Sequence, residues 1–155
     1  MTNPKAPPEE QTQPLRRTAL DLLARREHST LELRHKLLAR GHDEAAIDAE
    51  LTRLTADNLL NESRFAEVYG HSRADRGYGP LRIGSELRQR GIESATVDEV
   101  LAELDDLWME QLQRLHRKRF GAAPTSPADR ARQLRFLRQR GFTFEQINRL
   151  FKDHS

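Results

Sequence analysis

The 155-residue sequence contains no cysteine, which excludes disulfide bonds and thiolate zinc sites. It has no apolar run near the roughly 20 residues that a membrane-spanning helix requires. Its N-terminus lacks the basic and then apolar segments of a signal peptide. No segment alternates between apolar and polar residues as a half-buried strand does. We therefore expect a helical protein that works in the cytoplasm.

Motifs for catalysis and for cofactor binding are also missing. Gly77-Tyr78-Gly79 is followed by Pro80 and lacks the lysine and the free backbone N–H groups of a phosphate-binding loop. The six histidines are scattered, and a charged, solvated helix explains the acidic pairs better than acid–base chemistry does. We expect no enzyme activity, no cofactor and no metal ion.

A threefold repeat organises what is present. Gly41, Gly91 and Gly141 lie fifty residues apart, and an arginine precedes each of them. The register continues on both sides of each glycine, at Leu37, Leu87 and Leu137 and at Ile47, Val97 and Ile147. Such a pattern indicates one supersecondary unit that is copied and stacked.

Helix signals recur within each repeat. Apolar residues follow a spacing of three and four from Leu15 onward. Ser29 with Glu32 has the spacing of a capping box, and Pro80 suits the first position of a helix. Ser126-Pro127 with Asp129 marks a helix start in the same way in the third repeat. The three glycines fit the left-handed position that closes a helix, after which Asp43 and Thr143 are suited to cap the next one. Each repeat is thus predicted to contain three helices.

The predicted fold is all-α. We expect a disordered tail over 1–14, which is polar and rich in proline, then repeats over 15–60, 61–105 and 106–155. A unit of about fifty residues buries too little to be stable alone, so the three units should pack into an elongated, curved array.

Charge is strongly polarised along the chain although the net charge is only +2. Residues 111–140 contain nine Lys or Arg against one Asp, whereas residues 93–110 contain seven acids and no Lys or Arg. Arg40, Arg90 and Arg140 are equivalent positions, so stacked repeats would align them as a stripe for an extended anionic partner. Cations at helix C-termini also complement the helix dipole, which is the alternative explanation of each arginine.

The middle repeat contains a distinctive run of residues: Arg64–Tyr69, Arg73, Gly77–Ile83, Glu86-Leu87 and Gly91-Ile92. Together with matching positions in the first and third repeats, it resembles the signature of the RecX family over about 15–152. Asn58 and Asn61-Glu62 depart from the family pattern, which often has Gly and Asp-Asp there. Asn tolerates the left-handed conformation and also caps helices, so we expect the structure to be preserved.

The resemblance implies a regulatory protein that binds the RecA nucleoprotein filament. It implies inhibition of RecA ATP hydrolysis, of DNA strand exchange and of the co-protease action that triggers the SOS response. The residues that we predict to contact the filament are Arg34, Lys36, Arg40, Arg73, Arg76, Tyr78, Arg82, Arg88 and Arg90.

Two other functions fit the same sequence. Short three-helix units with basic second helices also suit a DNA-binding module of the helix-turn-helix type. A helical adaptor for some other acidic protein is the third possibility. Direct contact with DNA is also compatible with binding to the RecA filament, whereas a membrane or a small-molecule substrate is not expected.

Overall fold

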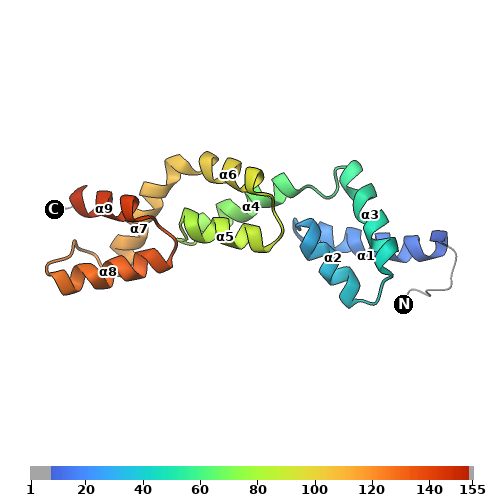
Figure 1. Ribbon diagram of the computed structural model, residues 1–155, viewed down its shortest axis with the longest axis horizontal. Helices are drawn as coiled ribbons and strands as arrows, with labels where there is room; N and C mark the ends of the chain where they lie inside the picture. Colours follow the sequence, from blue (N-terminus) through green and yellow to red (C-terminus); the bar gives the residue numbers. More distant parts are fainter. Residues whose placement is uncertain (1–7, 154–155) are drawn as a thin grey trace. The chain divides into compact units, whose positions relative to one another are not determined.

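The computed structural model describes residues 8–153. Within this range all regular secondary structure is helical, as predicted, with nine α-helices, one 3-10 helix and no strand (Figure 1). The helices are α1 (Pro8–Arg25), α2 (Thr30–Ala39), α3 (Glu44–Ala56), α4 (Glu62–Asp75), α5 (Pro80–Gln89), α6 (Ser94–Glu103), η1 (Asp105–Leu107), α7 (Trp108–Arg119), α8 (Pro127–Gln139) and α9 (Phe144–Asp153).

Local capping chemistry sets most of these boundaries. Ser29 and Glu32 form the predicted capping box at the start of α2, and the Ser126 hydroxyl accepts a hydrogen bond from the Asp129 N–H at the start of α8. Asp43 caps α3 in the same way. Left-handed backbone follows the second helix of each repeat, at Gly41, Gly91 and Gly141. These predictions from the sequence are confirmed.

The departures from the family pattern preserve the backbone. Asn58 is the only residue other than glycine with a positive φ in the described chain, at 58°. The Asn61 side chain accepts a hydrogen bond from the Arg64 N–H and so caps α4. Both outcomes agree with the expectation.

The first helix begins earlier than the sequence suggested. We expected a disordered tail over 1–14, but α1 starts at Pro8 and contains Pro14. Proline is tolerated in the first turn of a helix, so Pro8 does not oppose this start. Residues 8–14 are polar and show no apolar periodicity, so no sequence pattern indicated this part of the helix. Residues 1–7 of the predicted tail lie outside the described residues.

The described chain forms two compact units. Unit 1 consists of residues 8–66 and 90–92. Its helices α1, α2 and α3 pack against one another around a core that includes Leu15, Leu33 and Ile47.

One fully buried carboxylate lies beside this core. Glu50 on α3 forms ion pairs with Arg16 at 2.8 Å and with Arg53 at 2.7 Å. A buried charge is tolerated only when it is paired, so Glu50 ties α3 to α1.

Unit 2 consists of residues 67–89 and 93–153, and therefore contains most of the second repeat and the whole described part of the third. Ile83 and Leu87 on α5 are fully buried, together with Leu137 and Phe142. Most aromatic rings of the described chain are buried or half-buried, but Phe144 is 52% exposed.

Backbone hydrogen bonds join the two repeats of unit 2. The Gly79 N–H donates to the Arg140 carbonyl at 2.7 Å, and the Leu81 N–H donates to the Gly141 carbonyl at 2.9 Å. The two segments approach so closely that a Cβ on Gly141 would lie 2.5 Å from the Arg82 Cβ. Glycine at this position is therefore required by space as well as by its φ of 102°. We call this contact the Gly79–Gly141 joint.

Candidate partner-binding surface

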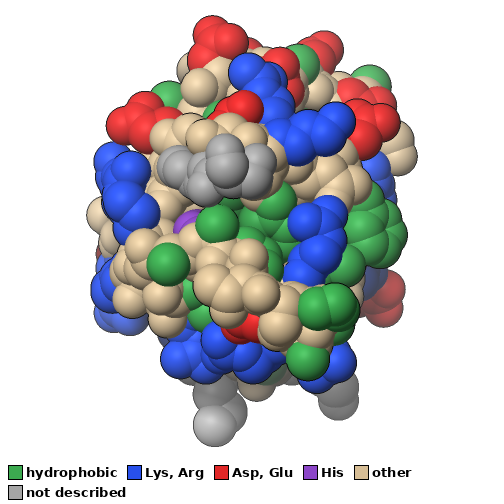
Figure 2. All heavy atoms as spheres, turned by 90° about the vertical axis from the view of Figure 1, so that its left-hand side faces the viewer, with side chains coloured by type: hydrophobic (Ala, Val, Ile, Leu, Met, Phe, Trp, Pro, Cys, Tyr) green, Lys and Arg blue, Asp and Glu red, His purple; other side chains and the backbone are tan. Residues whose placement is uncertain are grey.

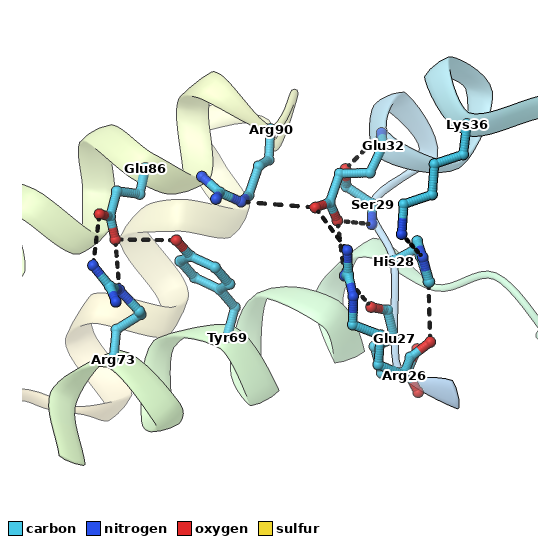
Figure 3. A network of polar contacts seen from close by, with 10 residues as sticks. All are labelled: Arg26, Glu27, His28, Ser29, Glu32, Lys36, Tyr69, Arg73, Glu86 and Arg90. Atoms are coloured by element: carbon cyan, nitrogen blue, oxygen red, sulfur yellow. Dashed lines mark hydrogen bonds and ion pairs between the residues drawn. The ribbon is translucent and has the colours of Figure 1, made fainter. Parts of the chain in front are cut away.

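Glu86 on α5 organises the polar side chains of unit 2. Its carboxylate accepts hydrogen bonds from the Tyr69 hydroxyl at 3.0 Å and from two nitrogens of Arg73 at 2.8 and 2.9 Å (Figure 3). Burial raises the pKa of Glu86, but the hydrogen bonds from Arg73 and Tyr69 outweigh burial, so the net pKa lies below its ordinary value. Glu86 therefore stays ionised and fixes Arg73.

Tyr78 collects three guanidinium groups around its ring. The guanidinium carbon lies 3.8 Å from the ring centroid for Arg73, 4.5 Å for Arg82 and 4.9 Å for Arg140. Cation–π contacts of this kind stabilise by about 0.5–1 kcal/mol each at exposed sites. The three arginines come from α4, α5 and the end of α8, so the half-buried ring links three elements. We call these four residues the Tyr78 arginine cluster.

The Gly79–Gly141 joint holds this cluster in place. It fixes the backbone of Arg140, and Arg82 also donates from Nη1 to the Gln139 carbonyl at 3.3 Å. The guanidinium groups of the cluster are thus positioned before any partner binds, which lowers the entropy lost on binding.

Several of the residues predicted to bind a partner already have partners within the fold. Arg34 pairs with Glu44 and Asp48 in unit 1, and Arg73 pairs with Glu86 in unit 2. These arginines contribute to the fold and present less free charge.

Looser pairs involve the arginines at the end of α5. Arg88 lies 3.9 Å from Asp98, and Arg90 lies 3.8 Å from Glu32. Both distances are near the limit for an ion pair. Arg88 is exposed, so its pair with Asp98 contributes little to stability.

Arg40 and Arg76 are exposed, and within the described residues neither has a carboxylate oxygen within 4 Å. They are the predicted contact residues that remain most available to a partner.

Lys36 has a different environment. Its Nζ donates to Nε2 of the buried His28 at 2.9 Å, and Nδ1 of His28 donates to the Arg26 carbonyl (Figure 3). Burial, followed by the charge of Arg26, lowers the pKa of Lys36, and burial also lowers that of His28. Lys36 therefore orders the start of α2 as well as carrying charge.

The structure brings Arg73, Tyr78 and Arg82 together, and it adds Arg140, which was not among the nine predicted contact residues. The fifty-residue register already marked Arg140 as equivalent to Arg40 and Arg90. What the register does not reveal is the aromatic ring on which Arg140 packs, because Tyr78 belongs to the preceding repeat.

Positive charge is unevenly distributed over the surface. On the face shown in Figure 2, Lys and Arg lie along the left and lower margins and also near the top, where most of the Asp and Glu side chains of this face lie. The described residues contain no helix long and apolar enough to cross a membrane. They also contain no group of three or more His, Asp or Glu arranged to hold a metal ion.

Models of the RecX family match the chain in all three repeats. The first three-helix domain of RecX matches residues 16–54, the second matches 61–101 and the third matches 105–151.

Curated relatives extend the similarity over most of the chain. The regulatory protein RecX of Pseudomonas savastanoi pv. phaseolicola is 48% identical over 137 residues, which cover 88% of each chain. The regulatory protein RecX of Halorhodospira halophila is 48% identical over 136 residues, covering 86% of this chain and 83% of the relative.

Solved structures share the fold. RecX from Lactobacillus salivarius superposes with a TM-score of 0.80 at 20% identity, over 94% of this chain and 97% of that one. A second crystal structure of regulatory protein RecX also gives a TM-score of 0.80, at 23% identity. With three matched domains and relatives 48% identical, the chain belongs to the RecX family of regulatory proteins.

Proposed function

We propose that this protein binds the RecA nucleoprotein filament and inhibits RecA. The activities affected would be ATP hydrolysis, DNA strand exchange and the co-protease action that triggers the SOS response. The observation that carries the proposal is the match of all three repeats to RecX, a family of regulatory proteins. The protein would act in the cytoplasm, through binding and without catalysis of its own.

The surface of the molecule supports binding to a repetitive, charged partner. The Tyr78 arginine cluster presents preordered cations, and Arg40 and Arg76 have no carboxylate within 4 Å in the described chain. Sites on successive repeats can contact several copies of a polymeric partner at once. Such multivalent binding raises avidity by about 10²–10⁴ without any single strong contact.

The first experiment measures the ATPase activity of RecA on single-stranded DNA while this protein is titrated in. We expect inhibition well below one molecule per RecA, at concentrations that leave the bare DNA unbound. If ATP hydrolysis and strand exchange are unchanged at a stoichiometric ratio, the proposal is wrong.

Charge reversal at exposed positions tests the surface. Arg40→Glu with Arg88→Glu should weaken inhibition about tenfold or more, because charged contacts contribute roughly 1.5–3 kcal/mol. Arg82 is left intact because it also contacts Tyr78 and the Gln139 carbonyl.

Arg25→Glu with Arg149→Glu is the matched control, since these exposed arginines are outside the predicted set and change the net charge equally. An equal loss of inhibition in both double variants would contradict a specific role of Arg40 and Arg88 in binding the filament. Helical content and the melting temperature should stay unchanged in both.

Direct DNA binding is a second candidate function. Helices α7 and α8 contain several exposed cations that have no carboxylate oxygen within 4 Å in the described chain, including Lys118, Arg119 and Arg135. This alternative predicts that inhibition follows the fraction of DNA occupied by the protein. It also predicts that affinity for DNA without RecA falls steeply with salt.

A further inference from the structure

Unit 2 contains a basic pocket that shares only Arg140 with the Tyr78 arginine cluster. It has a volume of about 310 Å³ and is lined by the end of α4, by one face of α7 and by the end of α8. Small-ligand sites span roughly 300–1,000 Å³, so this pocket is at the lower end of that range. We call it the α4–α7–α8 pocket.

The lining of the pocket is strongly cationic. Its charged side chains are Arg76, Arg114, Lys118, Arg119, Arg140 and Asp75. Five cations and one carboxylate leave a formal charge of +4 around the opening. Unlike most arginines in unit 1, these cations are poorly neutralised: within the described chain only Arg114 has a carboxylate within 4 Å, at Glu110. Like charges gathered around one space repel each other, and an anion in that space would relieve the repulsion.

Two of the pocket cations are held by aromatic rings. The guanidinium carbons of Arg119 and Arg140 lie 5.0 and 5.3 Å from the Phe136 ring centroid. Arg140 is further fixed by Tyr78 and by the Gly79–Gly141 joint. Pre-positioned guanidinium groups with several N–H donors match the oxygens of a phosphate better than a mobile ammonium does.

One residue that lines the pocket has a polar side chain with no hydrogen bond within the described chain. Gln111 is only 6% exposed, lines the pocket and forms no side-chain hydrogen bond within the described residues. No fully buried side-chain nitrogen or oxygen lacks a partner in that part of the chain. The Gln111 amide therefore reaches accessible space, and the pocket is the space that it borders. An amide there can donate to a phosphate oxygen or to a ring nitrogen.

The remaining wall is apolar and is formed by Leu115, Phe136 and Gly77. An apolar wall beside a polycationic opening suits a ligand with an anionic end and a flat organic body. We propose that the α4–α7–α8 pocket binds a nucleotide, with its phosphates at the cations and its sugar and base toward the apolar wall. The ligand is either a free nucleotide or a nucleotide within a single strand. The pocket is built from side chains, which a search for phosphate-loop motifs cannot detect.

Binding is measured on the full chain without RecA, at about 150 mM salt, so the result is independent of the proposed function. The probes are ATP, AMP, inorganic phosphate and a single-stranded oligonucleotide. Their binding is measured by calorimetry or fluorescence anisotropy. We expect ATP to bind more tightly than AMP, because the lining carries an excess of four positive charges. Binding of the oligonucleotide with no binding of ATP identifies the strand as the source of the nucleotide.

Two neighbouring residues supply the decisive comparison. Lys118 lines the pocket, whereas Arg117, which is also exposed and lies in the same turn of α7, does not. Lys118→Glu should weaken binding of the nucleotide or oligonucleotide about tenfold or more, and Arg117→Glu should change it less than about twofold. Arg114→Gln, one turn earlier, is the second pocket variant and should act like Lys118→Glu.

Three results would overturn the inference. The first is no binding of any probe by the wild-type chain. The second is an equal loss of affinity in Lys118→Glu and Arg117→Glu, which would indicate general electrostatic attraction. The third is binding of inorganic phosphate as tight as that of ATP, which would leave a plain anion site and no role for the apolar wall.

Discussion

At the scale of the residue, Gly41 and Gly141 are equivalent positions with different surroundings. Both have a positive φ, at 83° and 102°. A Cβ on Gly41 would meet no atom within 4 Å, whereas a Cβ on Gly141 would lie 2.7 Å from the Arg82 backbone nitrogen. The two sites thus separate backbone strain from steric overlap.

Alanine substitutions at these glycines should therefore differ. Gly41→Ala should lower the free energy of unfolding by about 1–2 kcal/mol, the cost of left-handed backbone for a residue with a Cβ. Gly141→Ala should lower it by more, because the Gly79–Gly141 joint must open. Urea denaturation measures both, and equal losses would mean that the joint contributes nothing to stability.

A second residue-scale prediction concerns pH. Burial, followed by the charges of Arg26 and Lys36, lowers the pKa of His28 below its ordinary value of 6.5. A histidine with a depressed pKa favours folding fully above its unfolded pKa, and this contribution is lost as the pH falls toward the folded pKa. Stability should therefore decrease between pH 7.5 and pH 5.5, and less so in His28→Gln. Urea denaturation at the two pH values checks this, and an unchanged slope in the variant would exclude His28 as the cause.

At the scale of the element, α2 and α5 illustrate two sources of helix stability. The capping box of α2 satisfies orphan backbone N–H groups through Ser29 and Glu32. Helix α5 lacks such a box and is fixed through buried Ile83 and Leu87 and through the Glu86 network. The local sequence specifies where α2 begins, whereas tertiary contacts hold α5 in place.

Truncation of Leu87 tests the packing of α5. Leu87→Ala should lower the free energy of unfolding by about 2–5 kcal/mol, because the side chain is fully buried. Leu81→Ala is the control on the same helix, since Leu81 is 49% exposed and should change stability far less. Equal effects would mean that α5 does not pack as described.

The same distinction explains what the sequence could predict. The caps at Ser29, Asp43 and Ser126 depend on residues three positions apart, so spacing alone indicated them. The pairing of Arg73 with Glu86 depends on the rotation of α4 against α5, which no local pattern contains. Arg140 was visible as a member of the repeat, but its packing on Tyr78 and its place in the pocket require the tertiary structure.

At the scale of the whole molecule, the polarised sequence becomes a set of charged surfaces on a helical scaffold. The proposed inhibition of RecA should therefore weaken as salt rises from about 50 to 200 mM, since exposed charges are screened over about 10 Å at 0.1 M. The inhibitory concentration of the wild-type chain should depend more steeply on salt than that of Arg40→Glu with Arg88→Glu. Parallel salt dependences would contradict a role for these arginines in binding the filament.

The Gly79–Gly141 joint also affects how such a protein can change over generations. Its two hydrogen bonds run between main-chain atoms, at the Gly79 N–H and the Leu81 N–H. Main-chain bonds are formed by any residue that has the right backbone, so the neighbouring side chains are free to drift while the connection is inherited. Only Gly79 and Gly141 themselves are irreplaceable, because a Cβ on either would lie within 2.6 Å of an atom in the opposing segment. Members of one family can thus diverge widely in sequence and keep the same register between their second and third repeats.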